Sequence, residues 1–167
     1  MSGHILIGMP VPLVRGCIRN KRRYNKSQIF NGPLFNRERK NMRLLLVEDD
    51  PIQLKYLKVL IEDSFPDISV TTSSTYKEAM NIIDTAAYID IFVLDIMLTD
   101  TEDDPDGVSL GVHIKELTKY TNTPVIFITS YESRIYEAVN DVHCYSFIPK
   151  PVDESLLIDT IDSLARQ

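Results

Sequence analysis

Five short apolar runs, each followed by a segment of helical periodicity, dominate the sequence from Met42 onward. The runs are rich in β-branched residues, which is typical of short buried strands. We expect strands at Arg43–Val47, Ile68–Thr72, Ile91–Leu94, Val125–Ile128 and Cys144–Ile148. We expect helices at Ile52–Ser64, Tyr76–Thr85, Val108–Tyr120, Ser133–Asn140 and Asp153–Ala165. Strands that alternate with helices in this way favour a parallel α/β architecture.

The helical segments carry apolar stripes that would cover such a sheet. Leu54, Leu57, Leu60 and Ile61 lie on one face of the first helix, and the last helix has a similar stripe. Parallel strands need crossover connections, which are right-handed and leave helices on both faces of the sheet. The sequence therefore predicts a flavodoxin-like, doubly wound (βα)5 parallel sheet with strand order 2-1-3-4-5.

Polar residues follow four of the predicted strands. They are Glu48-Asp49-Asp50 after the first strand, Asp95 after the third, Thr129-Ser130 after the fourth and Pro149-Lys150-Pro151 after the fifth. In an open α/β sheet, ligands bind beyond the carboxyl ends of the strands, at the switch point between the first and third. We therefore expect these side chains to converge there. Asp50 is the exception, because it precedes Pro51 and is expected to cap the first helix.

The expected cluster contains three carboxylates, from Glu48, Asp49 and Asp95. Each pair at 4 Å repels by about 4 kcal/mol at an effective dielectric constant of about 20, so positive charge is needed among them. Lys150 supplies one charge, and Mg²⁺ suits the oxygen ligands. Thr129 and Lys150 would donate hydrogen bonds to a phosphoryl group on Asp95, which is the positioning that phosphoryl transfer requires.

The segments Leu-Leu-Val-Glu-Asp-Asp, Val-Leu-Asp-Ile-Met-Leu, Phe-Ile-Thr-Ser and Lys-Pro occur in this order. They resemble the four signatures of response-regulator receiver domains of the CheY-like superfamily. The resemblance covers Arg43 to about Arg166. It implies a two-component signalling switch that takes phosphate from a sensor histidine kinase in a Mg²⁺-dependent reaction. It also implies slow autodephosphorylation rather than enzymatic turnover, and it allows a homodimer on phosphorylation.

The resemblance assigns roles to individual residues. Asp95 is the expected phosphoacceptor, which makes it catalytic together with Thr129 and Lys150. The expected metal site consists of Glu48, Asp49, Asp95 and the backbone carbonyl of Met97. Thr129 and Phe147 take the places of the switch hydroxyl and the switch aromatic residue. The Lys150–Pro151 peptide bond is expected to be cis.

Within the superfamily, the sequence looks most like the receivers of LytTR-type transcription regulators. The similarity rests on Leu-Asp-Ile-Met-Leu, on the run from Asp106 to Gly111 and on Phe-Ile-Thr-Ser. Two features depart from the common receiver pattern: Thr99 stands where most receivers have proline, and the acidic loop from Thr99 to Asp106 is longer. Neither feature involves the residues that are expected to take part in phosphorylation.

Residues 1–41 differ in character from the rest of the chain. They contain nine basic residues and one acidic residue, a charge of +8, whereas residues 42–167 contain nine basic and twenty-three acidic residues, a charge of −14. Prolines and glycines interrupt the first segment, so we expect a basic, disordered extension followed by a receiver domain at 42–167. The acidic domain is a poor nucleic-acid surface. No apolar run spans a membrane, and the scattered Cys17 and Cys144 fit free thiols in the cytoplasm.

Two alternatives remain. A haloacid-dehalogenase-like phosphatase also uses a strand-end aspartate nucleophile and Mg²⁺, but it has a second aspartate two residues later, where this chain has Met97. A receiver-like module could instead bind partners without phosphorylation, although Glu48, Asp49, Asp95, Thr129 and Lys150 are all present. The chain ends at Gln167, before any effector domain, so we expect a stand-alone receiver or, as the LytTR-like pattern favours, a fragment of a transcription regulator. DNA contact would come only through such an effector domain.

Overall fold

The structure is a computed structural model that describes residues 41–98 and 105–166. Its five strands are β1 (Met42–Val47), β2 (Ile68–Ser73), β3 (Ile91–Leu94), β4 (Val125–Thr129) and β5 (Ser146–Pro149). All neighbouring strands are parallel, and their order is β2-β1-β3-β4-β5. The predicted doubly wound fold and strand order are confirmed.

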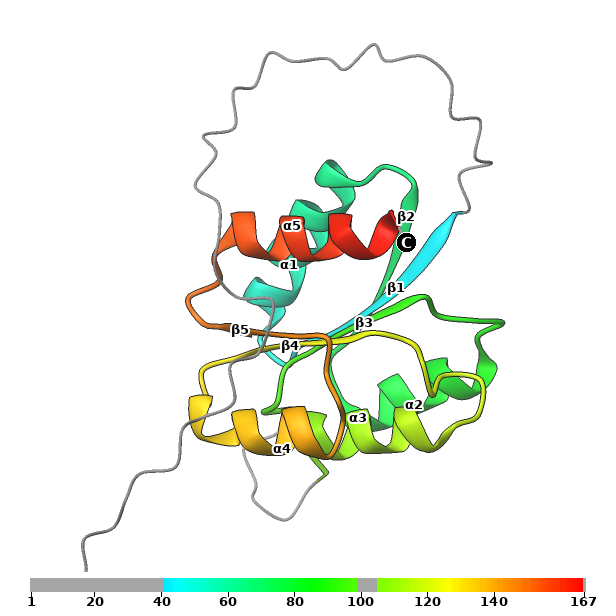
Figure 1. Ribbon diagram of the computed structural model, residues 1–167. Helices are drawn as coiled ribbons and strands as arrows, with labels where there is room; N and C mark the ends of the chain where they lie inside the picture. The colour runs from blue at the N-terminus through cyan, green and yellow to red at the C-terminus, as the bar shows by residue number, and fades with distance from the viewer. Residues whose placement is uncertain (1–40, 99–104, 167) are drawn as a thin grey trace, which may run out of the picture. The chain divides into compact units, whose positions relative to one another are not determined.

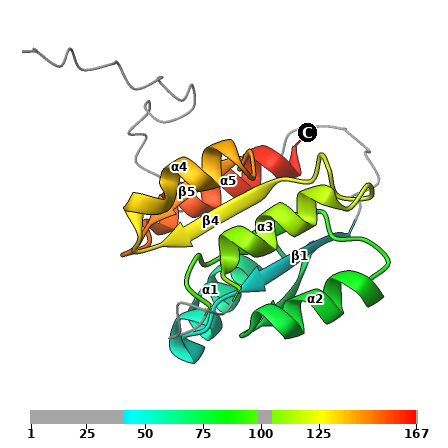
Figure 2. The same ribbon diagram turned by 90° about the horizontal axis from the view of Figure 1, so that it is seen from below.

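The helices form one layer on each face of this sheet. They are α1 (Pro51–Ser64), α2 (Tyr76–Thr85), α3 (Gly107–Glu116), α4 (Ile135–Asn140) and α5 (Glu154–Ala165), with a short 3₁₀ helix, η1 (Glu132–Arg134), before α4. Figure 1 shows α1 and α5 on one side of the sheet, and Figure 2 shows the opposite side, covered by α2, α3 and α4. None of the described helices is long and apolar enough to cross a membrane.

The strand β1 contributes to the cores on both faces of the sheet. Leu45 and Val47 belong to the cluster that packs under α2, α3 and α4, whereas Leu44 and Leu46 belong to the cluster under α1 and α5. Successive side chains of a strand point to opposite faces, so an uninterrupted apolar run is suited to a sheet covered on both sides. This burial determines the register of β1 and hence the position of Glu48, which follows it.

An aspartate in the preceding loop caps each of the helices α1 and α5. Asp50 caps α1 as predicted, since its Oδ1 accepts hydrogen bonds from the amides of Ile52 at 2.8 Å and Gln53 at 3.2 Å. Asp153 caps α5 in the same way, so α5 begins one residue later than predicted. These bonds satisfy amides that have no partner within the helix.

Several element boundaries differ from the prediction, among them the end of α3 and the start of β5. The helix α3 ends at Glu116 rather than Tyr120, and the turn that follows buries the Tyr120 ring against Phe92 and Tyr88, at centroid distances of 5.2 and 5.3 Å. Burying this ring outweighs further helical hydrogen bonds. The strand β5 begins at Ser146 rather than Cys144, after His143 adopts a left-handed conformation with φ of 51°.

Two predicted segments fall largely outside the described residues. They are the basic extension at 1–41, of which only Asn41 is described, and residues 99–104 of the acidic loop.

Candidate phosphoryl-acceptor site

The predicted site residues meet at the carboxyl ends of β1, β3, β4 and β5. Glu48 and Asp49 follow β1, Asp95 follows β3, Thr129 ends β4 and Lys150 follows β5. The strand register aligns these ends, because Val47 is the Cα partner of Leu94 and Thr129 is the partner of Pro149. The sheet therefore brings together residues as far apart in the sequence as Glu48 and Lys150, which are 102 positions apart.

The Lys150 ammonium group joins two of the carboxylates. Its Nζ lies 2.8 and 3.0 Å from the two carboxylate oxygens of Glu48 and 2.6 Å from Asp95 Oδ2. The side chains of Glu48 and Asp95 are only 1% and 5% exposed, and that of Lys150 is 15% exposed. Buried charges of this kind need a partner, and each carboxylate has one in Lys150.

The pKa values reflect this charge arrangement. Burial raises the pKa of Glu48 to about 7; the hydrogen bond from Lys150 opposes the shift, and the nearby charge of Asp95 adds to it. Burial alone would lower the pKa of Lys150, but hydrogen bonds to Asp95 and Glu48 outweigh it and raise the pKa. The ammonium group therefore stays protonated and balances part of the acidic charge.

Glu48, Asp49 and Asp95 form a group of oxygen donors that suits a hard divalent cation. Each offers one carboxylate oxygen, and these oxygens all lie within 4.8 Å of one another. Asp49 is exposed, whereas the other two are buried, so the group opens to solvent on one side. Mg²⁺ favours a few carboxylates and keeps several waters, and the donor set fits that preference.

Met97 contacts this acidic group through its backbone amide, and Thr129 ends the neighbouring strand β4. The Met97 amide donates to Asp95 Oδ1 at 3.2 Å, so both oxygens of the Asp95 carboxylate have partners. Thr129 is fully buried, and its Oγ1 accepts a hydrogen bond from the Tyr131 amide at 3.2 Å. As an acceptor in this bond, the hydroxyl keeps its own proton to donate.

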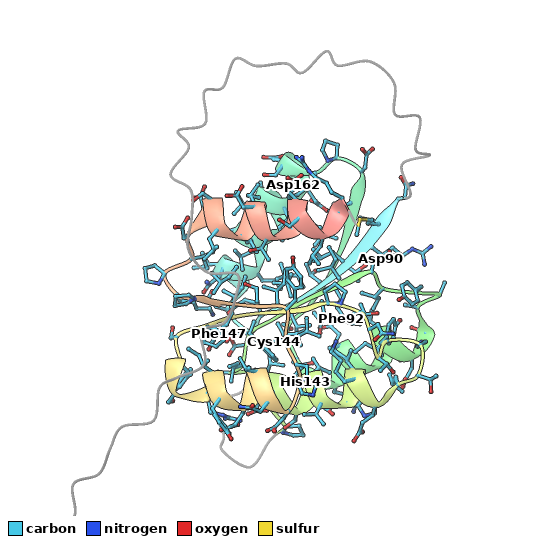
Figure 3. The ribbon with its side chains drawn as sticks, viewed as in Figure 1. Asp90, Phe92, His143, Cys144, Phe147 and Asp162 are labelled. Atoms are coloured by element: carbon cyan, nitrogen blue, oxygen red, sulfur yellow. The ribbon has the colours of Figure 1, made fainter. Side chains whose placement is uncertain are left out.

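Phe147 and the β5–α5 connection complete the set of predicted positions. Phe147 is half-buried and packs against the core cluster on the side of α4 (Figure 3). The Lys150–Pro151 peptide bond is cis, as predicted. The Lys150 amide donates to the Thr129 carbonyl at 2.9 Å, which ties the turn after β5 to the end of β4.

The role of Gly107 was not recognised from the sequence. A Cβ atom at this position would lie 1.8 Å from the carbonyl oxygen of Asp95, and the Gly107 amide donates to the Ile96 carbonyl at 2.8 Å. The α3 N-terminus is thus in direct contact with the backbone of Asp95. An Asp-Gly pair before a helical segment signals a helix start, but it does not reveal this contact.

The comparisons with known proteins agree with this geometry. The family profile "Response regulator receiver domain" matches residues 44–162. The chain therefore belongs to the receiver-domain family of two-component response regulators.

The chain is also similar to individual proteins and solved structures. It is 31% identical over 130 residues to the transcriptional regulatory proteins GlrR of Escherichia coli K12 and QseF of Escherichia coli O157:H7. These alignments cover 77% of this chain but only 27% of either relative. The crystal structure of the signal receiver domain of a DNA-binding response regulator (merR) from Colwellia psychrerythraea 34H is similar, with a TM-score of 0.67 and 25% identity. It covers 75% of this chain and 99% of that one.

Proposed function

We propose that Asp95 accepts a phosphoryl group from the phosphohistidine of a sensor histidine kinase. A carboxylate oxygen of Asp95 attacks phosphorus, the phosphorus–nitrogen bond of the donor breaks, and the electron pair returns to the imidazole, which takes up a proton. The contact between the Asp95 carboxylate and Lys150 Nζ, at 2.6 Å in a nearly buried pocket, carries the proposal. It places a cation next to the oxygens on which negative charge increases.

We assign the remaining site residues as follows. Glu48, Asp49, Asp95 and the Met97 carbonyl would hold Mg²⁺, and Thr129 would donate a hydrogen bond to a phosphoryl oxygen. When bound, Mg²⁺ neutralises negative charge on the carboxylates and on the phosphoryl oxygens. Thr129 and Phe147 would pass the change to the surface near α4 and β5. The domain would act as a switch with slow autodephosphorylation and not as a turnover enzyme.

The partners and setting follow from the same proposal. We propose that the receiver comprises residues 42–167 and works in the cytoplasm. We also propose that it controls transcription, as the names of its relatives suggest. A homodimer on phosphorylation, and DNA contact through an effector domain only, belong to this proposal. The LytTR-type subgroup stays a prediction, since the relatives named above do not support it.

The test is the mass of the intact protein after incubation with acetyl phosphate, with and without Mg²⁺. We expect one added phosphoryl group per chain with Mg²⁺ and much less with a chelator, because the acidic group is then not neutralised. Absence of labelling with Mg²⁺ would favour the alternative in which the domain binds partners without phosphorylation. The family match already favours a receiver over a haloacid-dehalogenase-like phosphatase.

Mg²⁺ titration should report on the acidic group directly. We expect MgCl₂ at millimolar concentrations to shift the amide signals of Asp49, Asp95 and Met97, since a bound ion changes the field at these positions. NaCl at matched ionic strength is the control for screening. Asp49→Asn should weaken the response, because it removes one anionic ligand. Equal shifts with NaCl, or in the variant, would contradict the metal site.

The domain boundary predicts that the extension contributes little to stability. Deleting residues 1–41 should change the melting temperature by less than about 5 °C, which corresponds to about 1 kcal/mol for a domain of this size. The reason is that a basic segment interrupted by proline and glycine has little apolar surface to bury. Thermal unfolding of the full chain and the shortened chain measures this. A larger fall would show that the extension packs on the domain.

A further inference from the structure

A partly buried ion pair joins two connections at the carboxyl end of the sheet. Arg134 lies between β4 and α4, and its Nη2 is 2.8 Å from Asp106 Oδ2, in the connection from β3 to α3. The same guanidinium group contacts Glu137 Oε2 through Nη2 and Nε, both at 2.6 Å. The side chains of Arg134 and Asp106 are 31% and 17% exposed, so water screens this pair less than a surface pair.

The Asp106 end of the pair is fixed relative to the phosphoacceptor. Asp106 caps α3 by accepting a hydrogen bond from the Ser109 amide at 2.8 Å. The next residue, Gly107, is in contact with the backbone of Asp95 and bonds to Ile96. The Asp106 carboxylate is therefore held at a defined place with respect to Asp95.

The Arg134 end of the pair is linked to the Thr129 hydroxyl. The Arg134 amide donates to the Tyr131 carbonyl at 3.0 Å, and the Tyr131 amide donates to Thr129 Oγ1 at 3.2 Å. The Thr129 hydroxyl and the Arg134 amide are thus linked by two hydrogen bonds through the backbone of Tyr131. A shift of Arg134 would change the geometry that orients this hydroxyl.

Few of the described side chains between Tyr131 and Ala138 are buried. Tyr131, Ile135 and Tyr136 are 46%, 38% and 76% exposed, and Ala138 is the buried residue of α4. Arg134 stands at the N-cap position of α4 without a capping hydrogen bond from its side chain. With so little apolar surface buried, a charged contact to a fixed partner carries much of the positioning.

Each charge of the pair shifts the pKa of the other group toward its ionised form. Burial would raise the pKa of Asp106, but the amide of Ser109 and the charge of Arg134 lower it. Burial would lower the pKa of Arg134, but its two carboxylate partners raise it. Both groups are therefore ionised near neutral pH, and the contact is an ion pair rather than a neutral hydrogen bond.

We propose that Arg134 is a positioning residue for phosphoryl transfer, which holds the segment carrying Thr129 in register with Asp95 through Asp106. The inference rests on the proposed function, because it concerns the hydroxyl that would donate to the phosphoryl group. Small displacements of a positioning group lower the rate without changing the chemical groups themselves.

The test measures the rate of phosphorylation by acetyl phosphate in the full chain with Mg²⁺, per folded molecule. Arg134→Gln and Asp106→Asn should each lower the rate about fivefold, the effect of an ion pair at the upper end of the exposed range. Asparagine caps helices as well as aspartate does, so Asp106→Asn keeps the start of α3. The double variant should be no slower than either single variant, because both remove the same contact. Arg134→Lys should recover part of the rate.

A spectroscopic signal separates positioning from loss of stability. The Tyr131 amide resonance should shift in Arg134→Gln and Asp106→Asn, since its bond to Thr129 changes, whereas a merely less stable fold leaves it in place. Glu137→Gln removes the partner within α4 and keeps the pair between the connections, so its rate should stay close to that of the unaltered chain.

Several results would overturn the inference. They are unchanged rates in the first two variants, additive losses in the double variant, an unmoved Tyr131 amide, or a loss in Glu137→Gln as large as in Arg134→Gln. Failure of the unaltered chain to take up phosphate at all would instead refute the proposed function.

Discussion

Replacing Asp95 with asparagine is expected to abolish phosphate uptake while the domain stays folded. The substitution is nearly isosteric, but an amide does not attack phosphorus as a carboxylate does. Asp95 is 5% exposed, so the neutral amide also removes a buried charge, and Lys150 keeps its contacts with both oxygens of Glu48. We therefore expect no labelling of the variant and only a small decrease in its stability.

Intact mass after incubation with acetyl phosphate and Mg²⁺ measures this prediction, and peptide mapping locates the modified residue in the unaltered chain. Asp159→Asn is the matched control, because it makes the same substitution at an exposed position of α5. The control should be labelled like the unaltered chain. Labelling of Asp95→Asn would mean that another residue is the acceptor.

Gly107→Ala is expected to be the most destabilising single change at the site. A Cβ atom there would lie 1.8 Å from the Asp95 carbonyl oxygen, 2.8 Å from the carbonyl carbon and 3.0 Å from the Ile96 Cα. All three atoms belong to the backbone, so no side-chain rotation relieves the overlap. Overpacking costs about 1–3 kcal/mol even where side chains adjust, and we expect the upper end or more. The melting temperature should fall by about 10 °C.

Gly111→Ala provides the control within the same helix. A Cβ atom at Gly111 would meet side-chain atoms of Val142 at 2.9 and 3.0 Å and of Phe127 at 3.1 Å. These atoms can move by a few tenths of an ångström, and alanine is favoured over glycine in a helix by up to about 1 kcal/mol. Chemical denaturation of both variants makes the comparison. Equal stability of the two variants would contradict the backbone overlap at Gly107.

The sequence was sufficient to predict the fold and the grouping of the site residues. Runs such as Leu44–Val47 and Ile91–Leu94 identify buried parallel strands, and the polar residues directly after them must meet at one edge of the sheet. The contact between Lys150 and two carboxylates follows from the same argument, because charges buried at one edge need a counter-charge.

Features that depend on the path of the connections could not be predicted in this way. Tyr120 continues a helical pattern in the sequence, yet it ends up in the core because a turn after Glu116 places its ring there. No sequence spacing pairs Arg134 with Asp106, because their contact depends on where two separate connections lie in space. The backbone contact at Gly107 likewise depends on three-dimensional distances alone.

The aromatic cluster around Tyr120 determines which part of the fold near-ultraviolet circular dichroism reports on. The protein contains no tryptophan, so its near-ultraviolet circular dichroism arises mainly from its eight tyrosines and six phenylalanines. The Tyr120 ring is fully buried, is perpendicular to Phe92 and lies beside Tyr88, which makes it a rigid chiral chromophore at the amino end of β3. Tyr131, by contrast, is 46% exposed next to Thr129. The dichroism band thus reports tertiary packing at the end of the sheet opposite Asp95, whereas tyrosine emission contains a component from the side of the candidate site.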